Sequence, residues 1–336
     1  MYVVRTVKNK EKTLNNMTEG KTVAVVMCTY NGEKFLREQL DSILRQTYPI
    51  SEIIVQDDCS TDSTVAILRS YAARDGRVRV IVNEHNLGFN RNFRSAVMKA
   101  TADFVAISDQ DDVWMPDKIE RQVEAIGQYN ICYSDHLRGT TLEGAHTVSP
   151  RCSLEALMFG GFAGHTMLLR RDFVQRDDVW MDGIYYDWSL GLNAYFHGEK
   201  AITHIGKPLN WHRSHPQEAA LLQSLSVNPA PKSRPTWQPY VLGYAHFHRL
   251  QRKPAWQRLY SHILENTRGP RFHIHHTMAR LMLSHSPLAM LRLCTICMKH
   301  RRDIYPNATK TNGMMGMVRG FCWPMIFAYR CSQFDL

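Results

Sequence analysis

Residues 22–31 read Thr-Val-Ala-Val-Val-Met-Cys-Thr-Tyr-Asn, an apolar run of strand length that ends in polar residues. A segment with helical spacing of its apolar residues follows at 33–46, and short apolar runs return at 53–55, 78–82 and 104–107. Short apolar strands that alternate with amphipathic helices predict an α/β fold, with a mainly parallel sheet flanked by helices.

The composition of the 336-residue chain supports a folded protein with a substantial core. Hydrophobic residues make up 44% and charged residues 21%, which excludes a disordered polymer. The longest apolar stretch, 281–298, is interrupted by His285, Pro287 and Arg292, so we expect no membrane-spanning helix. Residues 1–20 read as a flexible polar leader without the apolar core of a secretory signal. The expected location is therefore the cytoplasm.

Charge is distributed unevenly and divides the chain. Residues 1–231 contain 25 Lys and Arg against 28 Asp and Glu, whereas residues 232–336 contain 16 against 3. We therefore expect a near-neutral α/β domain at 21–230 and a helical basic region at 231–336. The cations of that region are interleaved with aromatic residues, which suits the anionic inner face of the cell membrane. A solvated surface and nucleic-acid binding are the alternatives, of which nucleic acid is the less favoured.

Cysteine and histidine patterns give little support for a zinc site or disulfides. The eight cysteines are scattered through a long chain, so we expect them to be reduced. Cys294-x-x-Cys297 has metal spacing but no second pair. His212, His215 and the His273–His276 cluster have no nearby cysteine or acidic pair to complete a tetrahedral zinc site, and the His273–His276 cluster is expected on a solvated surface.

Polar residues follow each of the first four predicted strands. They are Thr29-Tyr30-Asn31, Asp57-Asp58, Asn86-Leu87-Gly88 and the run 108–112. Each alone is compatible with an ordinary turn. In an open parallel sheet, however, ligands bind beyond the carboxyl ends of the strands, so four such groups at one edge predict a binding site.

The acidic cluster after the fourth strand is the sharpest signal. Asp109, Asp111 and Asp112 place three carboxylates in four residues, and they repel one another unless a cation lies among them. Hard oxygen ligands suit Mn²⁺ or Mg²⁺ bound together with substrate phosphates. The alternative to a metal site is that these acidic residues only form a capped loop before a helix at Pro116. Because the chain has no P-loop or dinucleotide fingerprint, metal and basic side chains would have to hold the phosphates.

These ordered motifs, above all Ser108-Asp-Gln-Asp-Asp-Val-Trp114, resemble those of the family 2 glycosyltransferases. The likeness covers about residues 20–215 and is strongest to the rhamnosyltransferase-like members that build bacterial surface polysaccharides. It implies the GT-A fold, a nucleotide-diphosphate sugar donor and inversion at the transferred sugar.

The resemblance also implies roles for individual residues. Asp57 would accept from the nucleotide base, with Cys28 and Tyr30 beside it. Asp109 would face the ribose or the sugar, and Asp109 and Asp111 would hold the metal. The other predicted contacts are the catalytic base Asp187, the donor-site residues Thr29 and Asn86, and the basic pair Arg213 and His215 near the diphosphate.

The predicted reaction is transfer of a hexose or deoxyhexose to a glycan or a polyprenyl-diphosphate-linked acceptor, by an enzyme peripheral to the inner face of the membrane. Inverting transfer needs one base and a stabilised leaving diphosphate, and no second carboxylate has to act as an acid. Asp187 could instead cap a helix. A sugar-phosphate nucleotidyltransferase is the alternative enzyme, but Tyr30-Asn-Gly-Glu33 lacks the glycine-rich loop expected of one.

Overall fold

The computed structural model describes residues 20–215, 237–305 and 311–331. The chain divides into two compact units. The first, here called the sheet unit, comprises residues up to 149 with 163–180 and 197–214. The second, the helical unit, comprises 150–162, 181–196 and the residues from 215 onward.

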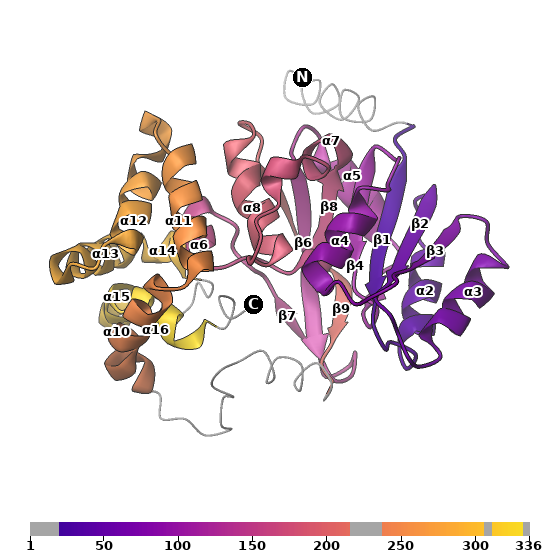
Figure 1. Ribbon diagram of the computed structural model, residues 1–336, viewed down its shortest axis with the longest axis horizontal. Helices are drawn as coiled ribbons and strands as arrows, with labels where there is room; N and C mark the ends of the chain where they lie inside the picture. Colours follow the sequence, from indigo (N-terminus) through magenta and orange to yellow (C-terminus); the bar gives the residue numbers. More distant parts are fainter. Residues whose placement is uncertain (1–19, 216–236, 306–310, 332–336) are drawn as a thin grey trace, which may run out of the picture. The chain divides into compact units, whose positions relative to one another are not determined.

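A nine-stranded mixed sheet forms the centre of the sheet unit (Figure 1). Its order is β3-β2-β1-β4-β8-β6-β9-β5, with β7 paired to β6. The strands are β1 (Val23–Thr29), β2 (Glu52–Asp57), β3 (Val78–Val82), β4 (Phe104–Ser108), β5 (Val113–Trp114), β6 (Ile131–Gly139), β7 (His146–Val148), β8 (Met167–Arg170) and β9 (Ile202–Arg213).

The first four strands run parallel, as predicted, and this brings their carboxyl ends together. Thr29 pairs with Asp57 across β1 and β2, and Met27 pairs with Ser108 across β1 and β4. Beyond β4 the pairing changes, because β8 is antiparallel to both β4 and β6, and β5 is antiparallel to β9. The parallel half therefore presents one polar edge, and β9 reaches it from the other half.

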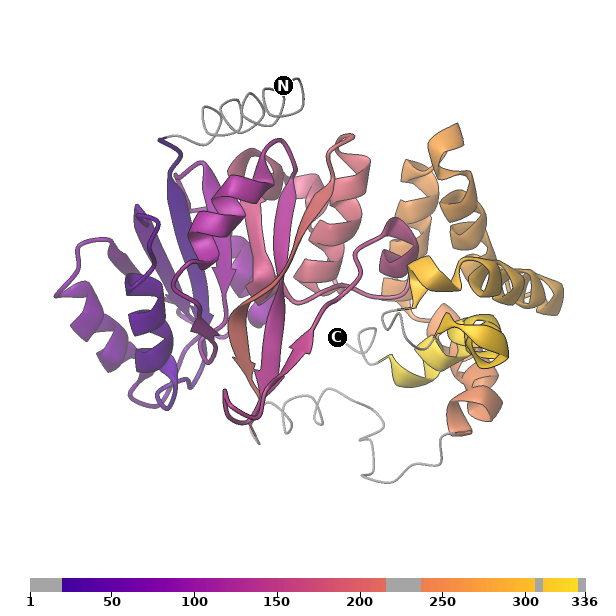
Figure 2. The same cartoon turned by 180° about the vertical axis from the view of Figure 1, so that it is seen from behind.

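Helices cover both faces of this sheet (Figures 1 and 2). Apolar residues of α2, α3 and α5 share one core with β1 and β2, whereas α4 packs on β1 and β2 from the other side. The helix predicted at 33–46 is present as α2 and is shorter at both ends, and the helix predicted at Pro116 is present as α5, which begins at Lys118. The helices are α2 (Leu36–Leu44), α3 (Thr64–Ala72), α4 (Phe89–Val97), α5 (Lys118–Ile126) and α7 (Arg171–Val174), with the short 3₁₀ turns η1 (Gly164–Thr166) and η2 (Asp177–Val179).

The helical unit brings two inner segments together with the basic C-terminal region. The Trp188 indole donates to the carbonyl of Leu157 at 2.6 Å, and the Tyr260 hydroxyl donates to that of Met158 at 2.8 Å. Its elements are α6 (Leu154–Leu157), α8 (Tyr186–Phe196), α10 (Gln238–Gln251), α11 (Pro254–Asn266), η3 (Pro270–Phe272), α12 (His273–Leu283), α13 (Pro287–Lys299), α14 (Arg301–Ile304), α15 (Gly313–Phe321) and α16 (Trp323–Arg330).

The two compact units do not follow the predicted boundary at residue 230. Residues 150–162 and 181–196 belong to the helical unit, because α6 and the fully buried Trp188 of α8 pack with the C-terminal helices. A boundary placed by charge could not detect this, since both segments are apolar. Residues 1–19 of the expected leader lie outside the described residues. Within the described part of the chain, no helix is long and apolar enough to cross a bilayer.

The crossing of α10 and α16 gives a test of the helical unit. A Cβ on Gly243 would lie 2.5 Å from the backbone oxygen of Met325, so Gly243→Ala should destabilise the full chain by about 1–3 kcal/mol despite its better helix propensity. Gly269→Ala, where a Cβ meets nothing within 4 Å, is the matched control. Urea unfolding measures both, and equal stability of the two variants would contradict this packing.

Candidate active site

Asp57 is fixed at the carboxyl end of β2 by three hydrogen bonds. The Thr29 hydroxyl donates to its Oδ2 at 2.8 Å, and Ser60 donates from its backbone nitrogen at 2.9 Å and from its hydroxyl at 2.5 Å. Asp57 is fully buried, and an ionised carboxylate has about four lone-pair sites, so one acceptor position remains. This arrangement is compatible with the predicted contact to a nucleotide base, which remains a prediction.

Asp58, which the sequence reasoning did not single out, shapes the loop after β3. Its carboxylate accepts from the backbone nitrogens of Leu87 at 2.7 Å and Gly88 at 2.9 Å. Asn86 takes part in the same turn, because its side chain donates to the Asp58 carbonyl at 3.1 Å and accepts from Gly88. Gly88 has a φ of 75°, a conformation that favours glycine. Asn86 therefore has a structural role here, and its contact with a donor remains a prediction.

Gln110, between the two predicted metal ligands, joins the ends of β4 and β1. Its Oε1 accepts from the Tyr30 nitrogen at 2.9 Å, and its Nε2 donates to the Tyr30 carbonyl at 3.1 Å. Gly32 makes room for it, since a Cβ there would lie 2.2 Å from Oε1. The side chain of Tyr30 stays 52% exposed and is free to meet a ligand. The pairing of Gln110 with Gly32 could not be read from either motif alone.

Arg213, at the end of β9, is held against the loop that carries the acidic motif. Its Nε donates to the Asp111 carbonyl at 3.3 Å, and the guanidinium also pairs with the Glu38 carboxylate. The same cation lies over the rings of Phe35 and Trp211, 4.6 and 4.3 Å from their centroids. The structure therefore brings Arg213 and Asp111 together, although the sequence separates them by about a hundred residues.

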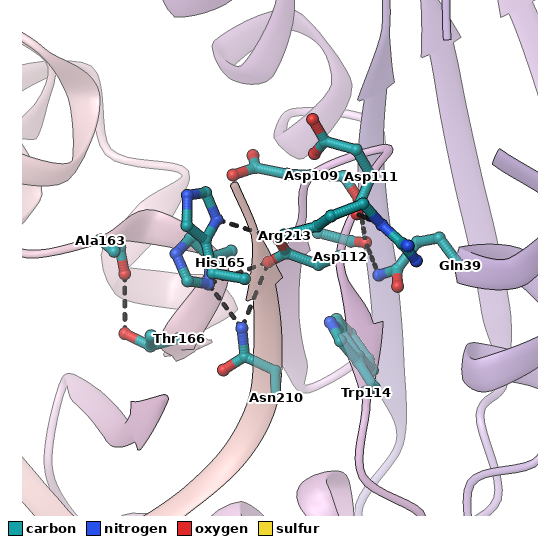
Figure 3. Close-up of polar contacts among 12 residues, drawn as sticks. Gln39, Asp109, Asp111, Asp112, Trp114, Ala163, His165, Thr166, Asn210 and Arg213 are labelled. Carbon is teal, nitrogen blue, oxygen red and sulfur yellow. Dashed lines mark hydrogen bonds and ion pairs between the residues drawn. The ribbon is translucent and has the colours of Figure 1, made fainter. Parts of the chain in front are cut away.

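The three carboxylates of the acidic cluster face different surroundings. Asp109 and Asp111 are half-exposed, whereas Asp112 is fully buried and turned toward His165 and Asn210 (Figure 3). Two half-exposed carboxylates on one loop are a donor set that fits Mn²⁺ or Mg²⁺, and Gln110 between them in the sequence is bound to the Tyr30 backbone. Asp112 belongs to a separate cluster.

Two further predicted residues flank this edge. Burial, followed by the charges of Asp109 and Asp58, raises the pKa of the Cys28 thiol, so Cys28 is protonated at neutral pH. His215 is half-buried and follows β9 directly, at the limit of the described residues. Their contacts with a nucleotide and a diphosphate remain predictions.

Asp187 belongs to the helical unit and lies inside the first turn of α8. The helix begins at Tyr186, so Asp187 is not the N-cap that the sequence left open. Its Oδ1 accepts from the Trp188 nitrogen at 2.7 Å. Burial raises the pKa of this carboxyl to about 7. A pKa close to the working pH is the property that a general base requires.

Comparison with known proteins places these features in a family. Residues 24–174 match glycosyl transferase family 2, the stretch that contains β1 through α7 and the acidic motif. This stretch is a family 2 glycosyltransferase domain. The predicted resemblance is thereby confirmed.

Relatives of the family 2 domain include two bacterial glycosyltransferases, one named for teichuronic acid biosynthesis and one for a diphosphoundecaprenol-linked acceptor. The chain is 36% identical over 112 residues to the putative teichuronic acid biosynthesis glycosyltransferase TuaG of Bacillus subtilis, covering 33% of this chain and 44% of TuaG. It is 32% identical over 111 residues to the glucosyltransferase WfgD of Escherichia coli, covering 33% and 43%. The chain thus spans less than half the length of these two relatives.

The fold is also that of a solved transferase. Staphylococcus aureus TarS, crystallised with UDP-GlcNAc, superposes with a TM-score of 0.55 at 15% sequence identity, over 93% of this chain and 90% of the TarS chain. At this identity the likeness shows the fold alone. The predicted GT-A architecture, with its mixed sheet and helical C-terminal region, is confirmed.

The raised pKa of Asp187 gives a pH prediction. A base must be deprotonated to act, so turnover should fall about tenfold for each pH unit below about 7 and level off above it. Asp187→Asn should lower kcat by several orders of magnitude and abolish the fall in turnover below a pH of about 7, because the amide accepts no proton. Asp182→Asn, at an exposed carboxyl nearby, is the control that should keep wild-type kcat. An unchanged kcat in Asp187→Asn would assign the base to another residue.

Proposed function

We propose that this protein is an inverting glycosyltransferase that moves a hexose or deoxyhexose from a nucleotide-diphosphate sugar to a glycan or polyprenyl-diphosphate-linked acceptor in cell-surface polysaccharide synthesis. The observation that carries the proposal is that the loop with the half-exposed Asp109 and Asp111, part of a family 2 domain, is bound at the Asp111 carbonyl by Arg213 of β9. Carboxylates for a cation beside a fixed guanidinium suit a diphosphate leaving group. The name of TuaG supports the polysaccharide context, and the name of WfgD supports a polyprenyl-diphosphate-linked acceptor.

In this mechanism the chain's own residues divide the work. Asp57 and Thr29 orient the nucleotide at the edge of the sheet, and Arg213 stabilises charge that develops on the departing diphosphate. Asp187 removes the proton from the acceptor hydroxyl as that oxygen attacks the anomeric carbon. Asp109 and Asp111 would hold Mn²⁺ or Mg²⁺, which supplies further positive charge to the diphosphate.

A screen of nucleotide sugars tests the proposal directly. Release of a nucleoside diphosphate should depend on one donor class, on an acceptor, and on added Mn²⁺ or Mg²⁺. A chain that releases pyrophosphate from a nucleoside triphosphate and a sugar phosphate would instead be the alternative nucleotidyltransferase.

Removal of the Asp111 carboxylate tests the metal requirement. Asp111→Ala should lose metal-dependent transfer by several orders of magnitude while the chain stays folded, because the carboxylate is half-exposed and the backbone carbonyl that binds Arg213 is kept. Asp172→Ala, which removes an exposed carboxylate from the same unit, should keep wild-type turnover. Full activity of Asp111→Ala, or of the wild type in excess chelator, would contradict a metal-dependent mechanism.

The helical unit has a surface that supports the proposed membrane partner. Helix α15 packs through glycine: a Cβ on Gly316 would lie 2.2 Å from the Thr311 carbonyl oxygen, and one on Gly320 would lie 2.8 Å from the Cβ of Arg301. Its larger side chains therefore face outward, and Met314 and Met315 are 75% and 60% exposed. An outward apolar face on a helix is typical of segments that bind at a bilayer surface.

Basic groups accompany exposed apolar residues elsewhere in this unit. A groove of about 520 Å³ is lined by residues of α12, α13 and the turn that follows, among them Leu288, Arg292, Lys299 and His300. Leu288 is 76% exposed. Cations beside exposed aliphatic side chains fit an anionic lipid surface, where each basic residue contributes about 1 kcal/mol. Such attachment would concentrate the enzyme where a polyprenyl-linked acceptor resides.

Vesicle co-sedimentation of the full chain tests this attachment. The protein should bind anionic vesicles, leave them as salt is raised, and bind them less when Met314 and Met315 are both changed to Gln. Val82→Gln, at an exposed residue of the sheet unit, is the control and should leave binding unchanged. Equal binding to neutral and anionic vesicles at low salt would refute the electrostatic part of the proposal.

A further inference from the structure

A second group of metal-ligating side chains lies in the sheet unit and has no part in the proposed reaction. It consists of Asp112 from the loop before β5, His165 from η1 and His212 from β9. The side chains are 0%, 5% and 16% exposed, respectively. Three segments far apart in the sequence therefore contribute one donor each to a closed, largely buried cluster.

The spacing of the donor atoms is close to that of a metal site. His165 Nδ1 lies 3.0 Å from Asp112 Oδ2, and His212 Nδ1 lies 3.0 Å from Asp112 Oδ1. All three ligand atoms lie within 4.8 Å of one another. Ligand atoms of a tetrahedral zinc ion are about 3.3 Å apart, since each bond is about 2.0 Å long. Small side-chain rotations therefore suffice to place an ion among them.

Hydrogen bonding alone does not satisfy this cluster. The Asn210 amide nitrogen lies 3.2 Å from Asp112 Oδ2 and 2.6 Å from His165 Nδ1, and those two atoms are themselves 3.0 Å apart. If the amide donates to both, two acceptors face each other without a proton. If the amide is turned over, its oxygen faces the carboxylate instead. With Asp112 ionised, either assignment leaves one repulsive contact, which a proton on the carboxyl or a cation would remove.

Two further buried polar atoms have unsatisfied hydrogen-bonding capacity. Asn210 Oδ1 and His136 Nδ1 have no hydrogen-bond partner among the described residues. His136 is 5% exposed, and its ring lies edge-on to that of His165 with 5.0 Å between centroids.

We propose that Asp112, His165 and His212 form a zinc-type cation site that is separate from the Asp109–Asp111 pair. Two imidazoles and one carboxylate suit Zn²⁺, whereas an all-carboxylate pair suits Mn²⁺ or Mg²⁺. The ion would tie the loop that carries the acidic motif to β9, which carries Arg213. Its role is therefore to hold these two parts of the site in register, and it takes no part in the transfer itself.

Zinc content of the full chain tests the proposal. After chelator treatment and re-addition of Zn²⁺, gel-filtered wild-type protein should retain about one ion per chain by elemental analysis. Asp111→Ala should retain the same amount, which separates this site from the catalytic pair. His165→Gln and, independently, His212→Gln should lose the ion. His204→Gln is the matched control, because His204 is an exposed histidine of β9 that pairs with Asp135.

A spectroscopic readout keeps the proposal testable if one variant folds poorly. Co²⁺ in place of Zn²⁺ should give the strong visible bands of a four-coordinate site in the wild type and in Asp111→Ala, and weak bands in a correctly folded His212→Gln. Zinc content in His165→Gln and His212→Gln equal to that of wild type would overturn the proposal. So would a wild-type chain that retains no zinc, in which case the cluster is a hydrogen-bonded core feature only.

Discussion

The loop between β4 and β5 is fixed from three directions, and the candidate site depends on this. Gln110 binds the backbone at the end of β1, Arg213 of β9 binds the Asp111 carbonyl, and Asp112 binds His212 inside the sheet unit. A loop of acidic residues would otherwise spread to relieve charge repulsion. These contacts come from the end of β1 and from β9. Because they fix the loop, the carboxylates of Asp109 and Asp111 remain together at the polar edge.

The structure sorts the acidic cluster by environment. Asp112 is fully buried, and its carboxylate contacts histidine and amide groups. The nearby Lys118 is also buried, and desolvation lowers the pKa of its amine to about 7, so it does not act as a permanent counter-ion. Asp109 and Asp111 are half-exposed on the same loop. A cation bound together with a diphosphate would interact favourably with both carboxylates, which couples metal and donor binding.

Much of the fold and the acidic motif could be predicted because both follow from local patterns. Alternating apolar runs gave β1 to β4 and their helices, and strand ends located Asp57 and Asp111. The anchors could not be predicted, since Gln110 and Asp58 act through contacts with distant loops and look like ordinary turn residues. The antiparallel pairings of β8 and β5 were also missed, because an apolar run in the sequence carries no sign of the direction in which its strand pairs.

The most direct measurement is a crystal structure of the chain with a nucleoside diphosphate and Mn²⁺, with anomalous data collected at the manganese edge. The account predicts one manganese peak between the diphosphate and the carboxylates of Asp109 and Asp111, with the base beside Asp57 and Arg213 near the phosphates. A nucleotide bound elsewhere on the chain, or a diphosphate at this edge without manganese, would contradict it.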